Sequence, residues 1–315
     1  MAFNIVGVGE VLWDLLQTGP QLGGAPANFA YHAHALGAQA YVITRVGSDD
    51  HGREVMRRFR DMGVKPDGIQ IDERAPTGTA RVTLSGAGLA HFTIQENVAW
   101  DFLALNSDAV ALAAQADAIC FGSLAQRSEV SRNSIQKLVG AAPSEALRVF
   151  DINLRQQFYS HEIVERSLQF ANVLKLNDDE LPTVARMFGL HGSTENQIRQ
   201  LARAFDLHLI ALTRGSNGSL LYQTQSNAAQ AAKADEGRWS NCRSRAVRVV
   251  DTVGAGDAFT AALVLGLLCK IDLDEINEIA NDVARYVCTQ AGATPTLPVE
   301  FERRFRSNRI GSHTA

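Results

Sequence analysis

The residues with the clearest chemical potential form one tetrapeptide, Gly254-Ala255-Gly256-Asp257, between a β-branched run and a stretch of helical composition. The first N–H groups of a helix have no partner within it, and the helix dipole adds partial positive charge there. Small residues let a ligand approach this backbone closely. The tetrapeptide therefore predicts an anion pocket with a carboxylate base at its rim, as phosphoryl transfer to a hydroxyl requires. A turn followed by a helix-capping acid explains the same residues.

Asp257 has no His, Lys or Cys near it in the sequence. We therefore expect it to have no partner and to work as an ordinary carboxylate, with the anion pocket carrying the developing charge.

A second glycine-rich element, "GGAPANFA" at 23–30, stands near the N-terminus. Gly23 and Gly24 predict a tight turn before a helix, and Asn28 falls in its first turn. The Asn28 amide can donate and accept hydrogen bonds, which suits a polyol substrate. A helix cap before an amphipathic helix is the alternative interpretation. The element is not a Walker A loop, because no Gly-Lys-Ser/Thr follows it. The first expected strand is not followed by a Gly-x-Gly-x-x-Gly fingerprint, which argues against a dinucleotide-binding site.

Three further segments carry polar residues in suggestive places. "DINLR" at 151–155 ends an expected strand, where open α/β sheets bind ligands. Arg155 could hold a phosphate bidentately, or form a surface salt bridge. "NDDE" at 177–180 is explained equally well as a solvated helix start, and "TRGSNG" at 213–218 as a plain hairpin.

The elements that must position these residues alternate between strand and helix. The alternation predicts a mostly parallel sheet with helices on both faces. The expected strands are 3–9, 40–47, 116–122, 147–153, 171–177, 207–213, 218–224 and 245–251. The expected helices are 28–36, 53–62, 128–139, 178–188, 195–205, 255–268 and 274–289.

One segment breaks this alternation. Residues 78–85 and 90–97 alternate in polarity around "GAGL", which predicts a hairpin. Residues 11–17 form a third strand candidate outside the main sheet. Together they predict a small sheet that stands off the main domain. The polar end of the chain is expected to be flexible.

The two glycine-rich elements together resemble the paired signatures of the ribokinase-like (PfkB-type) carbohydrate kinases. "GEVLWD" and "GGAPAN" look most like the fructokinase branch. The resemblance covers nearly the whole chain and implies a three-layer α/β/α domain with a small β lid over the sugar. It implies a main domain made of residues 1–10, 23–74 and 101–306. The lid is made of residues 11–22 and 75–100, and residues 307–315 form a flexible tail.

The resemblance also implies roles for individual residues. Asp257 is similar to the family's catalytic base, and the amides of Gly254, Ala255 and Gly256 to its anion hole. The residues similar to sugar-binding positions are Asp14, Gly23, Gly24, Asn28, Arg155 and Asp257. Those similar to ATP-binding positions are Asn177, Thr213, Gly215, Gly218, Gly254, Gly256 and Asn281.

Two metal sites follow from the resemblance alone. Glu180, with Asn177, matches a position that supports Mg²⁺, with water between them because Mg²⁺ keeps much of its hydration shell. Asp251 and the Val253 carbonyl match ligands of a K⁺ ion used by many relatives. Carbonyls near Cys288 and Ala291 are further candidates for K⁺.

Composition restricts the partners. The chain has 315 residues, of which 46% are hydrophobic and 20% charged, with a net charge of −4. A basic surplus is absent, so nucleic acid is not expected as a partner. We see no signal peptide and no apolar run long enough to span a bilayer. The scattered cysteines are typical of a cytoplasmic protein with reduced thiols: Cys120, Cys242, Cys269 and Cys288.

These observations predict an ATP- and Mg²⁺-dependent kinase that phosphorylates a sugar hydroxyl, with D-fructose as the first choice and K⁺ as a possible activator. Ribose, 2-keto-3-deoxygluconate and adenosine remain alternatives. A catalytically silent sugar-binding regulator on the same fold is a further alternative. Pairing of two lids would cover exposed sheet edges, which favours a homodimer.

Overall fold

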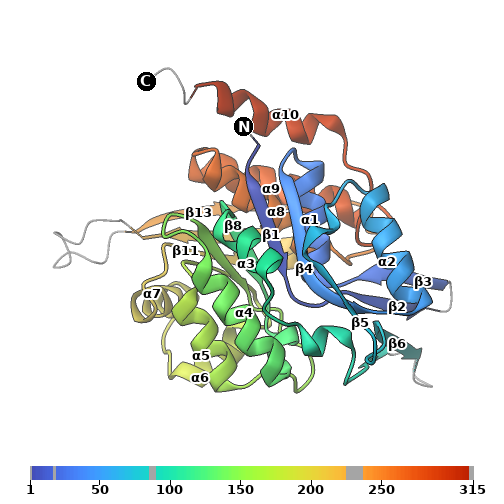
Figure 1. The fold of residues 1–315 in the computed structure, drawn as a ribbon. Helices are drawn as coiled ribbons and strands as arrows, with labels where there is room; N and C mark the ends of the chain where they lie inside the picture. Colours follow the sequence, from blue (N-terminus) through green and yellow to red (C-terminus); the bar gives the residue numbers. More distant parts are fainter. Residues whose placement is uncertain (1, 17–18, 85–89, 225–236, 312–315) are drawn as a thin grey trace.

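The main sheet is mostly parallel and continuous across the molecule (Figure 1). The computed structural model describes residues 2–16, 19–84, 90–224 and 237–311. Within them, the sheet has nine strands in the order β13 (Arg238–Cys242), β12 (Ser219–Gln223), β11 (Leu209–Thr213), β10 (Val173–Asn177), β9 (Leu147–Asp151), β8 (Ala118–Phe121), β1 (Asn4–Val8), β4 (Gln39–Gly47) and β5 (Ile69–Asp72). Only β12 and β13 pair antiparallel with their neighbours.

Helices cover both faces of this sheet and bury a separate hydrophobic cluster on each. One cluster gathers side chains from α1 (Ala25–Ala35), α2 (Asp50–Asp61), α8 (Ala255–Leu268), α9 (Leu273–Cys288) and α10 (Val299–Gly311). The other gathers side chains from α3 (Ser107–Ala114), α4 (Glu129–Ala141), α5 (His161–Phe170), α6 (Leu181–Phe188) and α7 (Thr194–Ala204). The predicted three-layer α/β/α architecture is therefore confirmed.

The strand β1 shows how the sequence divides its side chains between these layers. Ile5 belongs to the cluster beneath α1, α8 and α9, whereas Val6 and Val8 belong to the opposite cluster. Successive side chains of a strand point to opposite faces, so a fully apolar strand is the form expected at the centre of a sheet covered on both sides.

A second sheet stands apart from the first, as predicted. Its order is β3 (Gly19–Gly23), β2 (Leu12–Leu16), β6 (Gly78–Leu84) and β7 (Ala90–Ile94). We call it the lid. Strand β3 was not predicted, because its Gly-Pro composition argues against a strand. The expected turn at 86–89 lies outside the described residues.

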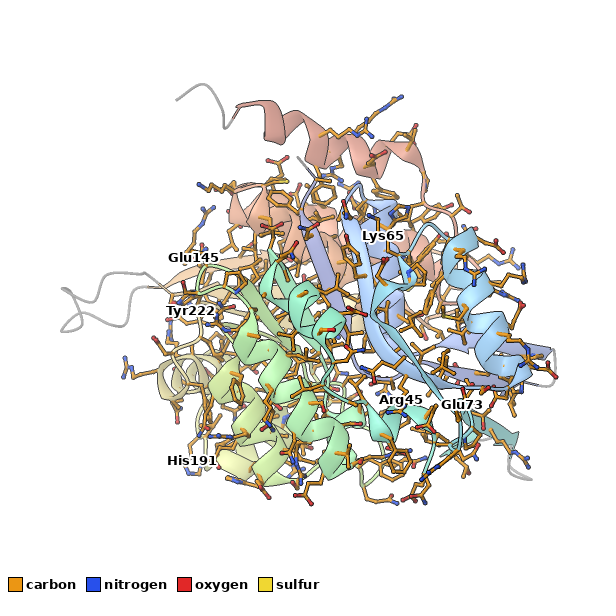
Figure 2. The ribbon with its side chains drawn as sticks, in the orientation of Figure 1. Arg45, Lys65, Glu73, Glu145, His191 and Tyr222 are labelled. Carbon is orange, nitrogen blue, oxygen red and sulfur yellow. The ribbon has the colours of Figure 1, made fainter. Side chains whose placement is uncertain are left out.

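Two arginines hold the chain where it enters and where it leaves the lid. Arg45, labelled on β4 in Figure 2, pairs with Asp72 at the end of β5 (Nε–Oδ2 2.8 Å). Arg127 pairs with Asp101 (2.8 Å) and donates to the carbonyl of Gln95, just beyond β7. Its guanidinium also lies 4.1 Å from the ring centroid of buried Trp100. These contacts fix the two passages of the chain between lid and main domain.

Some sequence expectations need correction. Residues 245–251 were expected to form a strand but have no strand structure, and Val249 and Val250 are exposed. The edge strand β13 lies further upstream instead. Helices α3, α5 and α10 and strand β5 were not predicted. The tail expected to be flexible from residue 307 instead continues α10 as far as Gly311.

None of the helices in the part of the chain that the structure describes is both long and apolar enough to cross a bilayer.

Candidate active site

A cavity of about 1,210 Å³ lies between the lid and the carboxyl ends of the main-sheet strands. Its lid wall contains Asp14, Gly23, Ala80 and Ile94. From the main domain come the start of α8 and the loops that follow β9, β10 and β11. This is where open α/β sheets place ligands, and the volume is large enough for two small molecules side by side. All of the predicted site residues except Glu180 and Asp251 line it.

The helix α8 begins at the floor of this cavity. Gly254 precedes it in the left-handed region, with φ of 79°. A Cβ atom at Gly254 would lie 2.2 Å from the Ala293 carbonyl oxygen, so no other residue fits without movement. The amide of Ala255 donates to the Thr252 carbonyl over 3.3 Å, so the protein already engages one of the three predicted anion-hole amides. The dipole and first-turn amides still favour an anion at this point.

Asp257 lies in the first turn of α8 and has a partner, contrary to expectation. The Asn28 side chain donates from Nδ2 to Asp257 Oδ2 over 2.9 Å, across 229 residues of sequence. Burial, together with the negative charge of Asp151, raises the pKa of Asp257 to about 6. The Asn28 hydrogen bond and the positive charges of Lys175 and Arg155 lower this pKa, but they do not cancel the rise. The carboxyl group is therefore not an ordinary one. A pKa of about 6 suits a general base that works near neutral pH.

A buried ion pair beneath the start of α8 was missed by the sequence analysis. Lys175 Nζ lies 3.0 Å from Asp151 Oδ1, and Thr260 donates to Asp151 Oδ2 over 2.9 Å. A Cβ on Gly256 would lie 3.1 Å from Lys175 Nζ, so the ammonium group sits under the first turn of the helix. Burial alone would lower the pKa of Lys175, but the negative charges of Asp151, Glu180 and Asp257 raise it. The cavity floor thus carries a fixed positive charge.

The lid side of the cavity holds the predicted sugar-binding residues. Burial raises the pKa of Asp14 to about 6, and the charge of Arg155 opposes this shift. A Cβ on Gly23 would lie 2.6 Å from Asp14 Oδ2, so glycine is needed here to leave room for the carboxylate. Gly24 has φ of 112°, and a Cβ there would lie 2.4 Å from the Glu10 carbonyl oxygen. Gly24 thus lets the start of α1 approach the backbone of Glu10 closely.

Glu10 also lines the cavity and was not predicted as a site residue. Its side chain is buried, with 2% exposure. Burial and the negative charge of Asp257 raise the pKa of Glu10 to about 7. The backbone amide of Glu10, the positive charge of Arg155 and the amide of Ala25 act in the opposite direction. The available signal was its place two residues beyond β1, since strand ends of such sheets carry binding residues.

Arg155 is exposed at the cavity wall, where its NH1 group donates to the Leu154 carbonyl over 3.2 Å. Its charge reaches Glu10, Asp14 and Asp257, and in each case lowers the pKa of the carboxyl group. Its position is compatible with the predicted contact to a phosphate.

The Asn177–Glu180 segment is a compact turn rather than a set of free ligands. Asn177 Oδ1 accepts from the amides of Asp179 and Glu180. The buried Glu180 carboxylate accepts from the amides of Leu154 (2.9 Å) and Asn177 (2.8 Å). Asn177 lines the cavity with Asp178 and Asp179, whereas Glu180 does not. Glu180 therefore positions the loop, and its predicted support of Mg²⁺ stays a prediction.

The other end of the cavity carries the predicted nucleotide residues. Thr213, Gly215 and Gly218 line it at the turn between β11 and β12. Asn281 on α9 lines it too, although its Nδ2 already donates to Ser219 Oγ (2.6 Å) and to the Asn277 carbonyl (2.8 Å). Exposed Val247 and Val249 add an apolar wall suited to a flat ring.

The predicted K⁺ ligands lie beside the loop before α8. Asp251 accepts from the amides of Val253 and Gly292, each over 3.0 Å. The Cys288 carbonyl accepts from the amide of Val250 over 2.8 Å. The segments are thus brought together, but K⁺ binding stays a prediction. Within residues 2–16, 19–84, 90–224 and 237–311, no three His, Cys, Asp or Glu side chains gather as a metal cluster.

Comparison with known proteins agrees with this geometry. The pfkB family carbohydrate kinase profile matches residues 10–300. The chain belongs to the PfkB family of carbohydrate kinases. All residues that line the cavity, from Glu10 to Cys288, fall within the matched range.

Individual relatives are similar over nearly their full length. A sugar kinase of Pyrococcus horikoshii is 28% identical over 311 residues, covering 93% of this chain and 92% of the relative. Its crystal structure, described as that of an uncharacterized sugar kinase, has a TM-score of 0.79 with 97% and 98% of the two chains covered. A fructokinase of Solanum tuberosum is 30% identical, with 95% and 93% covered. A fructokinase of Vibrio cholerae, solved with fructose, ADP and calcium, has a TM-score of 0.76 at 23% identity, with 96% and 98% covered, and so shows the fold alone.

The close approach of Gly254 to the Ala293 carbonyl leads to a prediction about stability and activity. Gly254→Ala should lower the free energy of unfolding by more than the roughly 1–2 kcal/mol that a left-handed conformation costs an alanine, because its Cβ would also collide with the Ala293 carbonyl. Gly189→Ala is the matched control: Gly189 has φ of 62° and nothing within 4 Å of its Cβ position. Urea unfolding and turnover should separate the two variants. Equal losses of stability would show that the contact with Ala293 does not matter.

Proposed function

We propose that this kinase transfers the γ-phosphoryl group of Mg·ATP directly to a hydroxyl of D-fructose. The observation that carries the proposal is the 2.9 Å contact of Asn28 with Asp257 at the start of α8, inside a cavity that the lid also walls. It joins a sugar-binding amide, a base and an anion site at one point. The fructokinase relatives support fructose as the substrate.

In this mechanism, Asp257 accepts the proton of the attacking hydroxyl while the Gly254–Gly256 amides hold the developing negative charge. Lys175 adds a fixed positive charge beneath them. Mg²⁺, when bound with ATP, would neutralise phosphate charge; Asp178 and Asp179 offer it oxygen atoms at the cavity wall, whereas Asn177 Oδ1 is already engaged by two backbone amides. Closure of the lid would exclude water and so suppress ATP hydrolysis. No phospho-enzyme is formed.

A neutral sugar fits this cavity better than a sugar acid does. Three carboxyl groups, those of Glu10, Asp14 and Asp257, face the sugar end, with Arg155 as the exposed counter-charge. A substrate carboxylate would add a further negative charge at a partly desolvated site, which is unfavourable. The electrostatics therefore favour fructose or ribose over 2-keto-3-deoxygluconate.

An ADP-release assay with Mg·ATP tests the proposal. We expect the highest kcat/KM with D-fructose, lower values with D-ribose and adenosine, and the lowest with 2-keto-3-deoxygluconate, compared with a control without sugar. Addition of K⁺ should raise turnover if the Asp251 loop binds it. Turnover with another sugar only would keep the mechanism and exclude fructose. No turnover with any would favour the silent binding protein.

Two further features belong to the same proposal. We expect the kinase to act in the cytoplasm, consistent with free Cys120 and Cys269 buried in its core. Homodimerisation through the lid stays a prediction.

A further inference from the structure

The side chain of Glu10 is the least satisfied polar group in the sugar end of the cavity. It is 2% exposed, and in the part of the chain that the structure describes its Oε2 atom has no hydrogen-bond partner. Leaving a buried polar atom unpaired costs free energy, so such an atom in a binding cavity points to a partner supplied by the ligand.

The surroundings of Glu10 limit what that partner can be. Asp257 is near enough for its negative charge to act on Glu10, and Arg155 provides an opposing positive charge. The amides of Glu10 and Ala25 also interact with the carboxyl group. Asp14 faces the same cavity from β2, and Lys175 faces it from β10, already paired with Asp151. A cation is not required to balance Glu10, and an anion would be repelled by its neighbours. A neutral hydroxyl fits.

We propose that Glu10 is a substrate-binding residue, whose Oε2 atom forms a hydrogen bond with a sugar hydroxyl next to the one that Asp257 deprotonates. The inference rests on the proposed function in requiring that the ligand is a sugar, but it does not depend on which sugar. It assigns to the segment after β1 a role in binding that complements those of Asn28 and Asp14 in the same cavity.

The protonation state of Glu10 gives the proposal a pH signature. Its pKa is raised to about 7, chiefly by burial. In its protonated form the carboxyl group donates one hydrogen bond and accepts another. Above pH 7 it becomes a second carboxylate beside ionised Asp257 and can only accept. A sugar hydroxyl whose oxygen accepts from the protonated carboxyl group loses that hydrogen bond on ionisation, so its binding should weaken as the pH rises through 7.

Two substitutions test the role. Glu10→Gln keeps a donor and an acceptor without a titrating proton, whereas Glu10→Leu keeps the approximate size and removes both. We expect Glu10→Leu to raise the KM for the sugar by about 10- to 100-fold, as loss of a hydrogen bond at a buried site does, while the KM for ATP changes less than about 3-fold. Glu10→Gln should stay within about 3-fold of wild type for both.

The pH profile separates binding from a structural role and remains informative if Glu10→Leu does not fold. The sugar KM of wild type should rise several-fold between pH 6 and 8.5, and that of Glu10→Gln should rise clearly less, by the share due to Asp14 and Asp257, whose pKa values are about 6. Asp117→Asn is the control: Asp117 accepts from the Asn4 amide over 2.7 Å at the other end of β1, and should keep the wild-type profile. An equal rise in wild type and Glu10→Gln, or an unchanged sugar KM in Glu10→Leu, would overturn the proposal.

The assay uses whichever of D-fructose and D-ribose wild-type protein phosphorylates, so failure of fructose alone leaves the test of Glu10 intact. If wild type phosphorylates neither, the proposed function fails, and Glu10 is judged by thermal stabilisation with D-fructose, D-ribose, adenosine and 2-keto-3-deoxygluconate. Stabilisation by one of them that Glu10→Leu removes and Glu10→Gln retains would support the proposal. Stabilisation by none of them, or stabilisation that Glu10→Leu retains, would overturn it.

Discussion

Asp257→Asn should lower kcat by about 10²- to 10⁴-fold, the range that a positioned general base contributes. The amide keeps the size of the side chain and can still accept from Asn28, which lies 2.9 Å from Asp257 Oδ2. It cannot remove a proton from the sugar. The KM values for sugar and ATP should therefore change much less than kcat, and steady-state kinetics at saturating ATP measures the difference.

The raised pKa of Asp257 adds a pH dependence to this result. A base must be deprotonated to act, so wild-type kcat/KM should fall as the pH drops below about 6, and the residual activity of Asp257→Asn should lack that limb. A wild-type profile that falls only near pH 4 would contradict the raised pKa. Near-wild-type turnover of Asp257→Asn would exclude Asp257 as the base.

The raised pKa of Asp257 also predicts a pH effect on stability, with a sign opposite to that of its effect on activity. The folded-state pKa of about 6 lies above the ordinary value of 3.8, so folding favours the protonated form. The stabilisation linked to that proton is fully present below pH 3.8 and is lost as the pH rises through about 6. At pH 7.5 the ionised carboxylate therefore opposes folding, and Asp257→Asn should have a Tm above that of wild type. Loss of activity with a raised Tm would exclude unfolding as its cause.

Local sequence patterns were sufficient for the parts of the site that depend on backbone geometry. The helix starts after Gly254 and after Gly24 have composition signals in the neighbouring residues, although Gly23 itself ends the strand β3 rather than forming a turn. The alternation of apolar strands and helices predicted the parallel sheet, and the end of a strand predicted the position of Arg155. These features need only neighbouring residues to form.

The parts that could not be predicted depend on contacts between distant segments. Asn28 and Asp257 are 229 residues apart, so no local pattern pairs them or predicts a raised pKa for Asp257. The β-branched run at 245–251 favours a strand by composition, but β12 pairs with β13 on that side, and Val249 and Val250 stay exposed. Tertiary pairing overrides local propensity in such cases.

The position of Lys175 inside an apolar strand is a sequence signal for a buried ion pair. A lysine inside the apolar run of β10 has to find a partner when that strand is buried. Its partner, Asp151, ends the neighbouring strand β9, and the two strands pair in parallel with Lys175 opposite Asp151. A buried charge in a central strand, next to an acid at the end of the adjacent strand, would have predicted the pair.

Lys175→Met should lower the free energy of unfolding by about 3–5 kcal/mol, because it leaves the Asp151 carboxylate buried without its counter-charge. The Nζ–Oδ1 distance is 3.0 Å, and both side chains are under 10% exposed. Among the side chains that the structure describes, the Thr260 hydroxyl, 2.9 Å from Oδ2, would remain to bind that carboxylate. Urea unfolding measures the loss, with circular dichroism to confirm that the variant folds.

An exposed ion pair of similar geometry provides the matched control. Arg238 lies 2.7 Å from Asp272 and 2.9 Å from Asp274, with all three side chains about half exposed. Arg238→Met should cost much less stability than Lys175→Met, since surface pairs contribute little. The double variant Asp151→Asn with Lys175→Met should recover part of the loss, because it removes the unpaired charge. If the loss of stability in Lys175→Met is no larger than in Arg238→Met, the Asp151 carboxylate does not need Lys175 as its counter-charge. The positive charge of Lys175 at the cavity floor would then not be explained by that ion pair.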